Sequence, residues 1–400
     1  MMNAPVFIAG VGAISAIGNN AAECLHSLEK EQAGMGGMEY LDSVHAKALP
    51  VAEVKLDNET LAHCLGLSAV VSRTAMLSMM AAKEALENAG IPDLAKHRTG
   101  FISANTVGGM DRTEQFFNNF LMDHKKGKLR DVVHHECGYI TELVADHLGI
   151  RNYITTISTA CSSSANSIFY GARLIRNKTL DVVVAGGTDA LTKFTLNGFN
   201  TLMILDHEFC RPFDENRKGL NLGEGAGYVV LVSEEVAGGL KNTPCCKLSG
   251  YCNANDAYHQ TASSPDGTGS FLAMKGALDR SGLKPSDIDY INLHGTGTQN
   301  NDIAEGTAVK RLFDPLYPKM SSTKSFTGHT LGASGGLEAV FSVLAIREKL
   351  IYPNLRLQTP MKELPFVPET SLIKNANVRN VLSNSFGFGG NCSSLIFSKI

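Results

Sequence analysis

The stretch Ser158-Thr159-Ala160-Cys161-Ser162-Ser163-Ser164-Ala165-Asn166 separates a β-branched run, residues 153–157, from an amphipathic segment that continues to about residue 175. This order predicts a strand, a tight turn and a helix. The turn places the Cys161 thiol at the N-terminus of the predicted helix, where the helix dipole favours a thiolate. These features favour a nucleophile, and an inert buried thiol is the alternative.

The same alternation of strand and helix patterns continues along the whole chain. Apolar runs typical of strands lie at 6–9, 100–103, 181–185 and 290–293. A helical pattern over 68–89 is closed by Gly90, a common residue at the end of a helix. The chain is therefore expected to be an α/β protein with sheets covered by helices.

Four of these patterns recur in the same order on both sides of a polar, breaker-rich stretch at 238–244. They pair 6–18 with 247–257, 101–109 with 291–297, 154–175 with 320–346, and 182–187 with 381–390. The repetition predicts an internal duplication with halves 1–240 and 241–400. Loops at the carboxyl ends of strands gather at one edge of an α/β sheet, so the two halves could share one site.

Composition excludes several classes of partner and setting. A formal net charge of −3 over 400 residues is not that of a nucleic-acid-binding protein. We see no apolar run of transmembrane length and no basic leader, so neither membrane insertion nor secretion is expected. Nine cysteines, an odd number at scattered spacings, indicate a reducing cytoplasm.

Two histidines and a lysine join Cys161 as candidates for catalysis. His294 opens HGTGT directly after a predicted strand, and Lys324 and His329 lie in SSTKSFTGH at 321–329. A thiolate with two histidines suggests acyl transfer. Backbone N–H groups at Cys161 and in the glycine-rich turn 386–390 could bind an oxyanion. Taken singly, each histidine could be structural and the lysine a surface charge.

Three other motifs do not support the function that they suggest. Residues 10–15 lack the third glycine of a dinucleotide-binding loop, and GEGAG at 223–227 lacks the Lys-Ser/Thr of a P-loop. His134-His135-Glu136-Cys137 resembles a metal cluster, but neighbours on the expected strand would point to opposite faces. We therefore expect no nicotinamide, nucleotide or zinc at these places.

Taken together, the motifs resemble the β-ketoacyl-acyl-carrier-protein synthases, most closely the elongating, KAS II-like branch. The resemblance covers nearly the whole chain. The matching motifs are TACSS (159–163), VAGG (184–187), RPFD (211–214), GEGAG (223–227), HGTGT (294–298), STKS (322–325) with Gly328-His329, and NSFGFGG (384–390).

The resemblance implies a thiolase-like fold of two duplicated αβαβα halves that form a five-layered body. It implies that Cys161 carries the growing acyl chain, and that His294 and His329 bind the malonyl thioester carbonyl during decarboxylation. Lys324 would orient the histidine pair. Phe388 would act as a gate, and its N–H would complete an oxyanion hole with that of Cys161.

Further roles follow from the same resemblance. Substrates would arrive on the phosphopantetheine arm of an acyl-carrier protein, and no nicotinamide or catalytic metal would be required. The implied substrate-binding residues are Thr296, Thr298, Phe386 and Val107. A structural sodium or potassium ion, found in some members, would be held by Asn292, Glu338, Ser383 and Asn384.

Some segments depart from the family pattern. Residues 129–149 lack the usual proline- and phenylalanine-rich stretch, Asn391-Cys392 stands where Thr-Asn is usual, and the chain is short between 205 and 211. We expect a fatty-acid-elongating synthase that forms a homodimer. The alternative is a polyketide or aryl-polyene ketosynthase paired with a chain-length factor. A coenzyme A-dependent thiolase and a non-catalytic carrier-protein-binding subunit fit the motifs less well.

Overall fold

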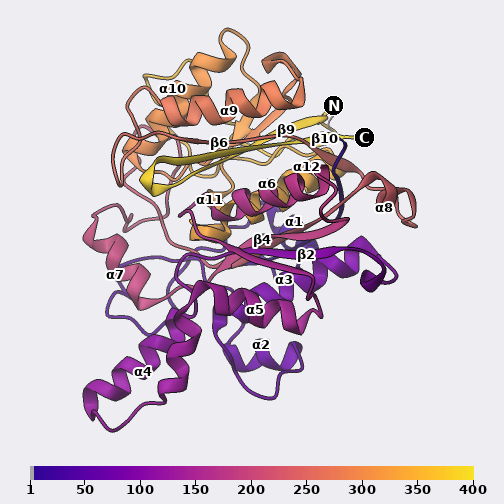
Figure 1. The fold of residues 1–400 in the computed structure, drawn as a ribbon. Helices are drawn as coiled ribbons and strands as arrows, with labels where there is room; N and C mark the ends of the chain where they lie inside the picture. Colours follow the sequence, from indigo (N-terminus) through magenta and orange to yellow (C-terminus); the bar gives the residue numbers. More distant parts are fainter. Residues whose placement is uncertain (1–3) are drawn as a thin grey trace.

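A computed structural model describes residues 4–400, and its ten strands form one continuous sheet (Figure 1). The order across the sheet is β3-β2-β4-β5-β1-β6-β10-β9-β7-β8. The strands are β1 (Phe7–Ser15), β2 (Thr99–Ala104), β3 (Tyr153–Ile157), β4 (Val182–Asp189), β5 (Gly225–Val232), β6 (Cys246–Asn255), β7 (Tyr290–Asn292), β8 (Lys319–Ser321), β9 (Asn380–Phe386) and β10 (Asn391–Lys399).

The sheet consists of two halves with the same topology. From the outer edge inward, the first half reads β3-β2-β4-β5-β1 and the second reads β8-β7-β9-β10-β6. In each half the first three strands pair in parallel and the last three pair antiparallel. The halves join where Phe7 and Ile8 pair with Lys247 and Cys246. All four sequence patterns that we matched fall on corresponding strands, so the predicted duplication is confirmed.

The body has five layers, as the resemblance implied (Figure 1). Two buried helices, α6 (Ser163–Arg176) and α12 (Ser334–Glu348), lie between the two half-sheets. All residues of α12 from Ser334 to Ile346 are buried, as expected for a helix packed on every side. Gly227 and Gly336 permit the contact of α12 with β5, because a Cβ on Gly336 would lie 2.3 Å from the Gly227 oxygen.

The outer layers cover the sheet faces that α6 and α12 leave open. They contain α3 (Arg73–Ala89), α5 (Cys137–His147), α9 (Thr268–Ser281) and α10 (Gln299–Phe313). The remaining α-helices are α1 (Ala21–Glu29), α2 (Asn58–Cys64), α4 (Met110–Met122), α7 (Lys193–Thr201), α8 (Glu234–Gly238) and α11 (Lys324–Thr327). Short 3₁₀ turns are η1 (Leu94–Lys96), η2 (Leu129–His135), η3 (Pro285–Asp287), η4 (Leu331–Ala333) and η5 (Phe388–Gly390). No helix in residues 4–400 is long and apolar enough to cross a membrane.

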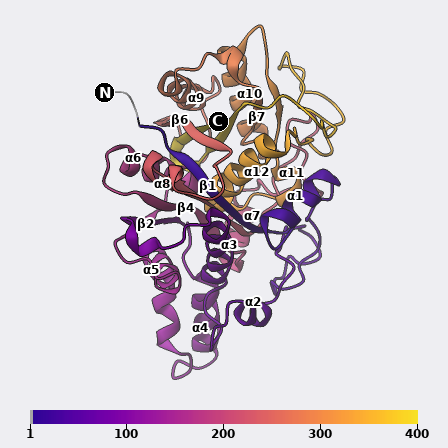
Figure 2. The same cartoon turned by 90° about the vertical axis from the view of Figure 1, so that its right-hand side faces the viewer.

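Two local expectations need correction. Helix α3 begins at Arg73 and not near residue 68, because its N-cap Ser72 has an extended backbone with ψ of 137°. Gly90 ends the helix in the left-handed conformation, as predicted. Residues 134–137 do not form a strand. They end η2 and begin α5, and the carbonyl oxygen of His134 accepts from Gly109 N–H at 2.7 Å. Helix α4 projects from the body (Figure 2), and η2 packs against it, so the two form one arm.

Candidate active site

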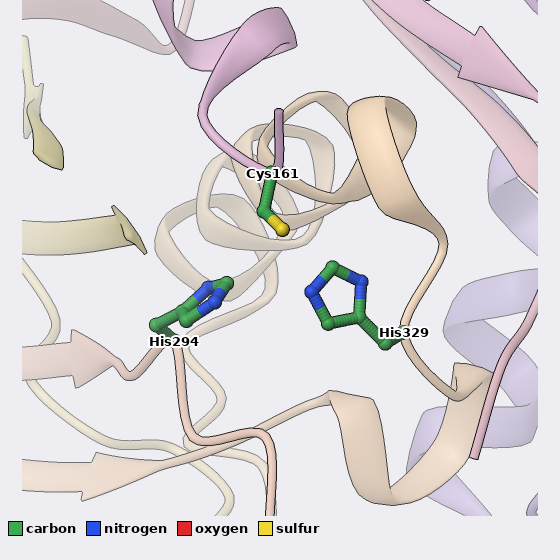
Figure 3. A group of neighbouring side chains, drawn as sticks. All are labelled: Cys161, His294 and His329. Carbon is green, nitrogen blue, oxygen red and sulfur yellow. The ribbon is translucent and has the colours of Figure 1, made fainter. Parts of the chain in front are cut away.

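The site lies where loops from both halves meet beyond the carboxyl ends of the strands. Cys161 follows β3, His294 follows β7, and His329 follows β8 and α11. The Cys161 thiol points towards the two imidazoles (Figure 3). One ligand atom from each of the three side chains lies within 4.8 Å of the others. The imidazole centroids are 5.4 Å apart, and the ring planes are nearly perpendicular at 88°.

The turn that carries Cys161 is held by its own small residues. Ala160 adopts a left-handed conformation with φ of 51°, which costs a non-glycine residue free energy. The Ser163 hydroxyl accepts from Thr159 N–H at 2.8 Å and donates to the Ala160 carbonyl at 2.5 Å. Helix α6 begins at Ser163, so the thiol lies at a helix N-terminus, as the sequence predicted.

Burial of the Cys161 thiol opposes the thiolate that its place at a helix N-terminus favours. Cys161 is only 7% exposed. Burial raises the pKa of its thiol to about 11, although Lys324 and the N–H groups of Phe388 and Cys161 act in the opposite direction. At neutral pH this raised pKa favours the protonated thiol.

Lys324 is buried against both a histidine and a carboxylate. Its ammonium group lies 3.2 Å from Nδ1 of His294 and forms an ion pair with the carboxylate of Glu338. An ammonium group can only donate, so Nδ1 of His294 is the acceptor. The proton of the neutral imidazole then sits on Nε2.

His329 is held in the same tautomer by different groups. Its Nδ1 accepts from Leu331 N–H at 3.0 Å and lies 3.2 Å from the Ser334 hydroxyl. Burial, and then the charge of Lys324, hold the pKa of His329 and of His294 well below its ordinary value. Both rings are therefore neutral, and each presents an Nε2–H donor to the site.

These neutral rings predict a loss of stability in mild acid. Below pH 6.5 a histidine in the unfolded chain takes up a proton, whereas the buried ring of the folded protein stays neutral. The free energy of unfolding is therefore highest above pH 6.5 and decreases as the pH falls. We expect roughly 1 kcal/mol of lost unfolding free energy per ring at pH 5.5. Urea unfolding of the wild type and of His329→Gln at pH 7.5 and 5.5 measures this. An equal loss in both proteins would contradict it.

A thiol and two imidazoles are also ligands of zinc sites. A metal-bound histidine coordinates through one nitrogen and donates its other N–H to a neighbour. Here Nδ1 of each ring accepts, so Nε2 carries the proton and has no lone pair for a metal. The Lys324 charge beside the rings further disfavours a cation. The arrangement fits a pair of donors to a substrate oxygen.

The turn of Phe388 lies beside the nucleophile. The backbone N–H groups of Phe388 and Cys161 lower the pKa of the thiol, against the effect of burial. Gly387 permits this approach, because a Cβ there would lie 3.1 Å from Cys161 N. The Phe388 ring stacks on Phe199 with centroids 5.9 Å apart. The role of these two N–H groups as an oxyanion hole stays a prediction.

A cavity of about 420 Å³ leads to Cys161 and both histidines. Thr296, Thr298, Phe386 and Phe388 line it. Val107 is not among its lining residues, and its backbone N–H faces Asp189 instead. The structure therefore brings three of the four predicted substrate-binding residues to one cavity, and their roles stay predictions.

Comparisons with known proteins agree with this geometry. Two family models match the chain. The model for the "Beta-ketoacyl synthase, N-terminal domain" matches residues 3–237, and that for the "Beta-ketoacyl synthase, C-terminal domain" matches residues 245–358. The chain belongs to the beta-ketoacyl synthase family. It is similar to the 3-oxoacyl-[acyl-carrier-protein] synthase 2 of Staphylococcus aureus strain N315, at 33% identity over 99% of each chain. The protein of the same name from Coxiella burnetii is 32% identical over 99% of this chain and 98% of its own.

Two solved beta-ketoacyl synthase relatives were determined with a chain length factor. The structure titled "The ishigamide ketosynthase/chain length factor" has a TM-score of 0.94 at 28% identity and covers 100% of both chains. The ketosynthase ApeO from Xenorhabdus doucetiae, in complex with its chain length factor ApeC, has a TM-score of 0.87 at 30% identity. That match covers 99% of this chain and 98% of the other.

The proposed cation ligands of this beta-ketoacyl synthase are partly engaged with protein groups. The Asn384 amide donates to Glu305 at 3.0 Å, and its oxygen accepts from Ser394 at 2.8 Å. One oxygen of Glu338 pairs with Lys324. The second Glu338 oxygen has no hydrogen-bond partner within residues 4–400, so it is the oxygen that fits a cation best. The remaining two, Asn292 and Ser383, are buried on β7 and β9, and the cation stays a prediction.

Two buried carboxylates that hold the HGTGT turn escaped the sequence analysis. Glu305 accepts from the N–H groups of His294 and Gly295 at 2.9 and 2.8 Å. Asp302 accepts from Thr296 N–H at 3.0 Å. Burial raises the pKa of Glu305 to about 7. Both residues are on α10, three positions apart. Acidic residues on the buried face of a predicted helix were the only sequence signal for their role.

A third buried carboxylate, Asp189, supports the loop that follows His329. It accepts from Gly332 N–H at 2.7 Å and from the Thr106 hydroxyl at 2.7 Å. Gly332 follows Leu331, whose N–H fixes the tautomer of His329. Burial raises the pKa of Asp189 to about 6. Asp189 is the last residue of β4, two positions after the VAGG motif, and the local sequence does not predict these contacts.

Proposed function

We propose that the protein is an elongating 3-oxoacyl-acyl-carrier-protein synthase that performs a decarboxylative Claisen condensation. One observation carries this proposal: the Cys161 sulfur and one nitrogen of each of two neutral imidazoles lie within 4.8 Å of one another, and each ring carries its proton on Nε2. In this proposal the N–H groups of Cys161 and Phe388 stabilise an oxyanion at the acylated sulfur, and the Nε2–H groups of His294 and His329 donate to the carbonyl of the second substrate. A condensation of two thioesters needs both pairs at once.

In the first half-reaction, the Cys161 sulfur attacks the thioester carbonyl of an acyl-carrier protein. The N–H groups of Cys161 and Phe388 stabilise the oxyanion that forms. The carbon–sulfur bond to the carrier breaks, and the departing pantetheine sulfur takes the proton that Cys161 loses. The products are the acyl-enzyme thioester and the free carrier thiol, which accounts for a nucleophile that rests as a neutral thiol.

In the second half-reaction, a malonyl-carrier protein loses carbon dioxide. The electron pair of the broken carbon–carbon bond forms an enolate, whose oxygen accepts from His294 and His329. The enolate carbon attacks the acyl carbonyl on Cys161, and the sulfur leaves and takes up one proton from solvent. Bringing both thioesters together contributes about 7–11 kcal/mol to lowering the barrier. No electrons are exchanged with a cofactor, so the reaction needs no nicotinamide.

The alternative within this function is a specialised chain, such as a polyene or polyketide, made together with a chain-length factor. The similarity to the ishigamide ketosynthase and to ApeO supports it. The arm of α4 and η2 also exposes apolar side chains that suit a partner subunit: Phe117, Leu121, Met122, Leu129 and Val133. We propose a dimer, either of two copies or with such a factor. Cysteines that are all free support a reducing cytoplasm.

The test offers purified protein a panel of acyl-carrier proteins together with malonyl-carrier protein. Mass spectrometry should find a 3-oxoacyl product that is two carbons longer than the primer, with release of carbon dioxide. Turnover of saturated primers by the protein alone would support fatty-acid elongation. Turnover only of unsaturated or aryl primers, and only with a second subunit, would support the specialised alternative. Acyl exchange with free coenzyme A alone would instead indicate a thiolase and contradict the proposal.

A further inference from the structure

Asn391 links the two turns that supply the N–H donors beside the thiol. It is the first residue of β10 and pairs with Asn255 of β6 in the antiparallel ladder, so its backbone is anchored. It directly follows η5, the turn that carries Phe388. Its carbonyl oxygen accepts from Gly387 N–H at 2.8 Å, which closes the glycine-rich turn onto the start of the strand.

The side chain of Asn391 reaches across to the other half of the protein. Its Oδ1 lies 2.7 Å from the Ser162 hydroxyl and accepts from the Asn166 amide at 3.0 Å. Ser162 follows Cys161 in the chain, and Asn166 is in the first turn of α6. The Asn253 amide donates to the same oxygen at 2.7 Å from the neighbouring strand β6. One oxygen thus lies within hydrogen-bond distance of three donor groups, one from the N-cap of α6 and one from its first turn. The single Ser162 proton is shared between this oxygen and the Thr159 carbonyl, also at 2.7 Å.

We propose that Asn391 is a positioning residue that sets the separation between the N–H groups of Cys161 and Phe388, an inference that rests on the proposed function of this N–H pair. Through its backbone, Asn391 holds the turn of Phe388. Through its side chain, it holds the turn of Cys161.

This position has a direct chemical consequence. Both N–H groups must be within hydrogen-bond distance of the same oxygen when the thioester carbonyl becomes an oxyanion. Loss of a single such donor typically costs about two to three orders of magnitude in rate, and small displacements cost less. Alkylation of the thiol by iodoacetamide forms no oxyanion, so it does not need the pair. The two reactions therefore separate positioning from general damage to the site.

The test compares the rates of both reactions at Cys161 in the wild type and in Asn391→Ala. We expect acylation by an acyl thioester to slow about tenfold to a hundredfold, while alkylation changes by no more than about threefold. Asn253→Ala is the matched control. It removes the donor to the Asn391 oxygen together with the bonds of the same amide to Asn166 and Ser393, but it leaves the contact between Asn391 and Ser162. Acylation should therefore stay within about threefold of the wild type.

Hydrogen exchange gives a second readout that does not depend on catalysis. In Asn391→Ala the amides of residues 159–164 and 386–390 should exchange faster than in the wild type, and those of β4 should not change. Equal slowing of acylation and alkylation, or unchanged exchange in both turns, would overturn the role of Asn391. If the wild type accepts no acyl group, the proposed function fails, and the exchange comparison still decides whether Asn391 holds the two turns.

Discussion

Replacing Cys161 by alanine is expected to lower the rate of condensation by about four to six orders of magnitude, because no other group can hold the acyl chain. Decarboxylation of malonyl-carrier protein should persist, since the Nε2–H groups of His294 and His329 remain in place. Assays of carbon dioxide release and of the 3-oxoacyl product separate the two steps. The expected result is acetyl-carrier protein without any elongated product.

The matched control is Cys64→Ala, which removes an exposed thiol outside the site. It should leave both condensation and decarboxylation within about twofold of the wild type. Retained condensation in Cys161→Ala would contradict the assignment of the nucleophile. Loss of decarboxylation in the same variant would contradict the separate task that we give to the histidine pair.

The second large effect is expected for Lys324→Met. The variant leaves the Glu338 carboxylate buried without its partner, which should cost about 3–5 kcal/mol of unfolding free energy. It also removes the donor that keeps the His294 proton on Nε2. We therefore expect malonyl decarboxylation to slow by about a hundredfold or more, since misplacing a catalytic proton has effects of this order or larger.

Combining Lys324→Met with Glu338→Gln separates the two effects. The double variant has no unpaired buried charge, so most of the lost stability should return, while decarboxylation stays slow. Chemical denaturation and single-turnover decarboxylation measure the two quantities on the same samples. Recovery of the decarboxylation rate together with stability would show that Lys324 serves packing alone and would contradict its task at His294.

Local patterns predicted much of the fold. The repeated order of strands, turns and helices predicted the duplication, since each half needs the same buried strands and the same loops. Gly90 correctly predicted the end of α3, because the left-handed backbone conformation at the end of a helix strongly favours glycine. The nucleophile turn was equally readable, as a strand, small residues and a helix meet at Cys161.

Features that depend on distant contacts were not predictable in this way. The raised pKa of Cys161 comes from burial by segments far away in the sequence, an effect opposite in sign to that of a helix N-terminus. Glu305, Asp302 and Asp189 looked like ordinary acidic residues until the fold placed backbone N–H groups of other segments around them. The segment at His134 looked extended, but it is a 3₁₀ turn that leads into α5.

The central claim is that Cys161 accepts an acyl group and gives it to a carbanion generated from malonyl-carrier protein. Intact-protein and peptide mass spectrometry after incubation with an acyl-carrier protein tests it most directly. The account predicts one acyl group per chain, on the peptide containing Cys161, and its transfer to a 3-oxoacyl product when malonyl-carrier protein is added. An acyl group on another residue, or one on Cys161 that malonyl-carrier protein does not discharge, would contradict it.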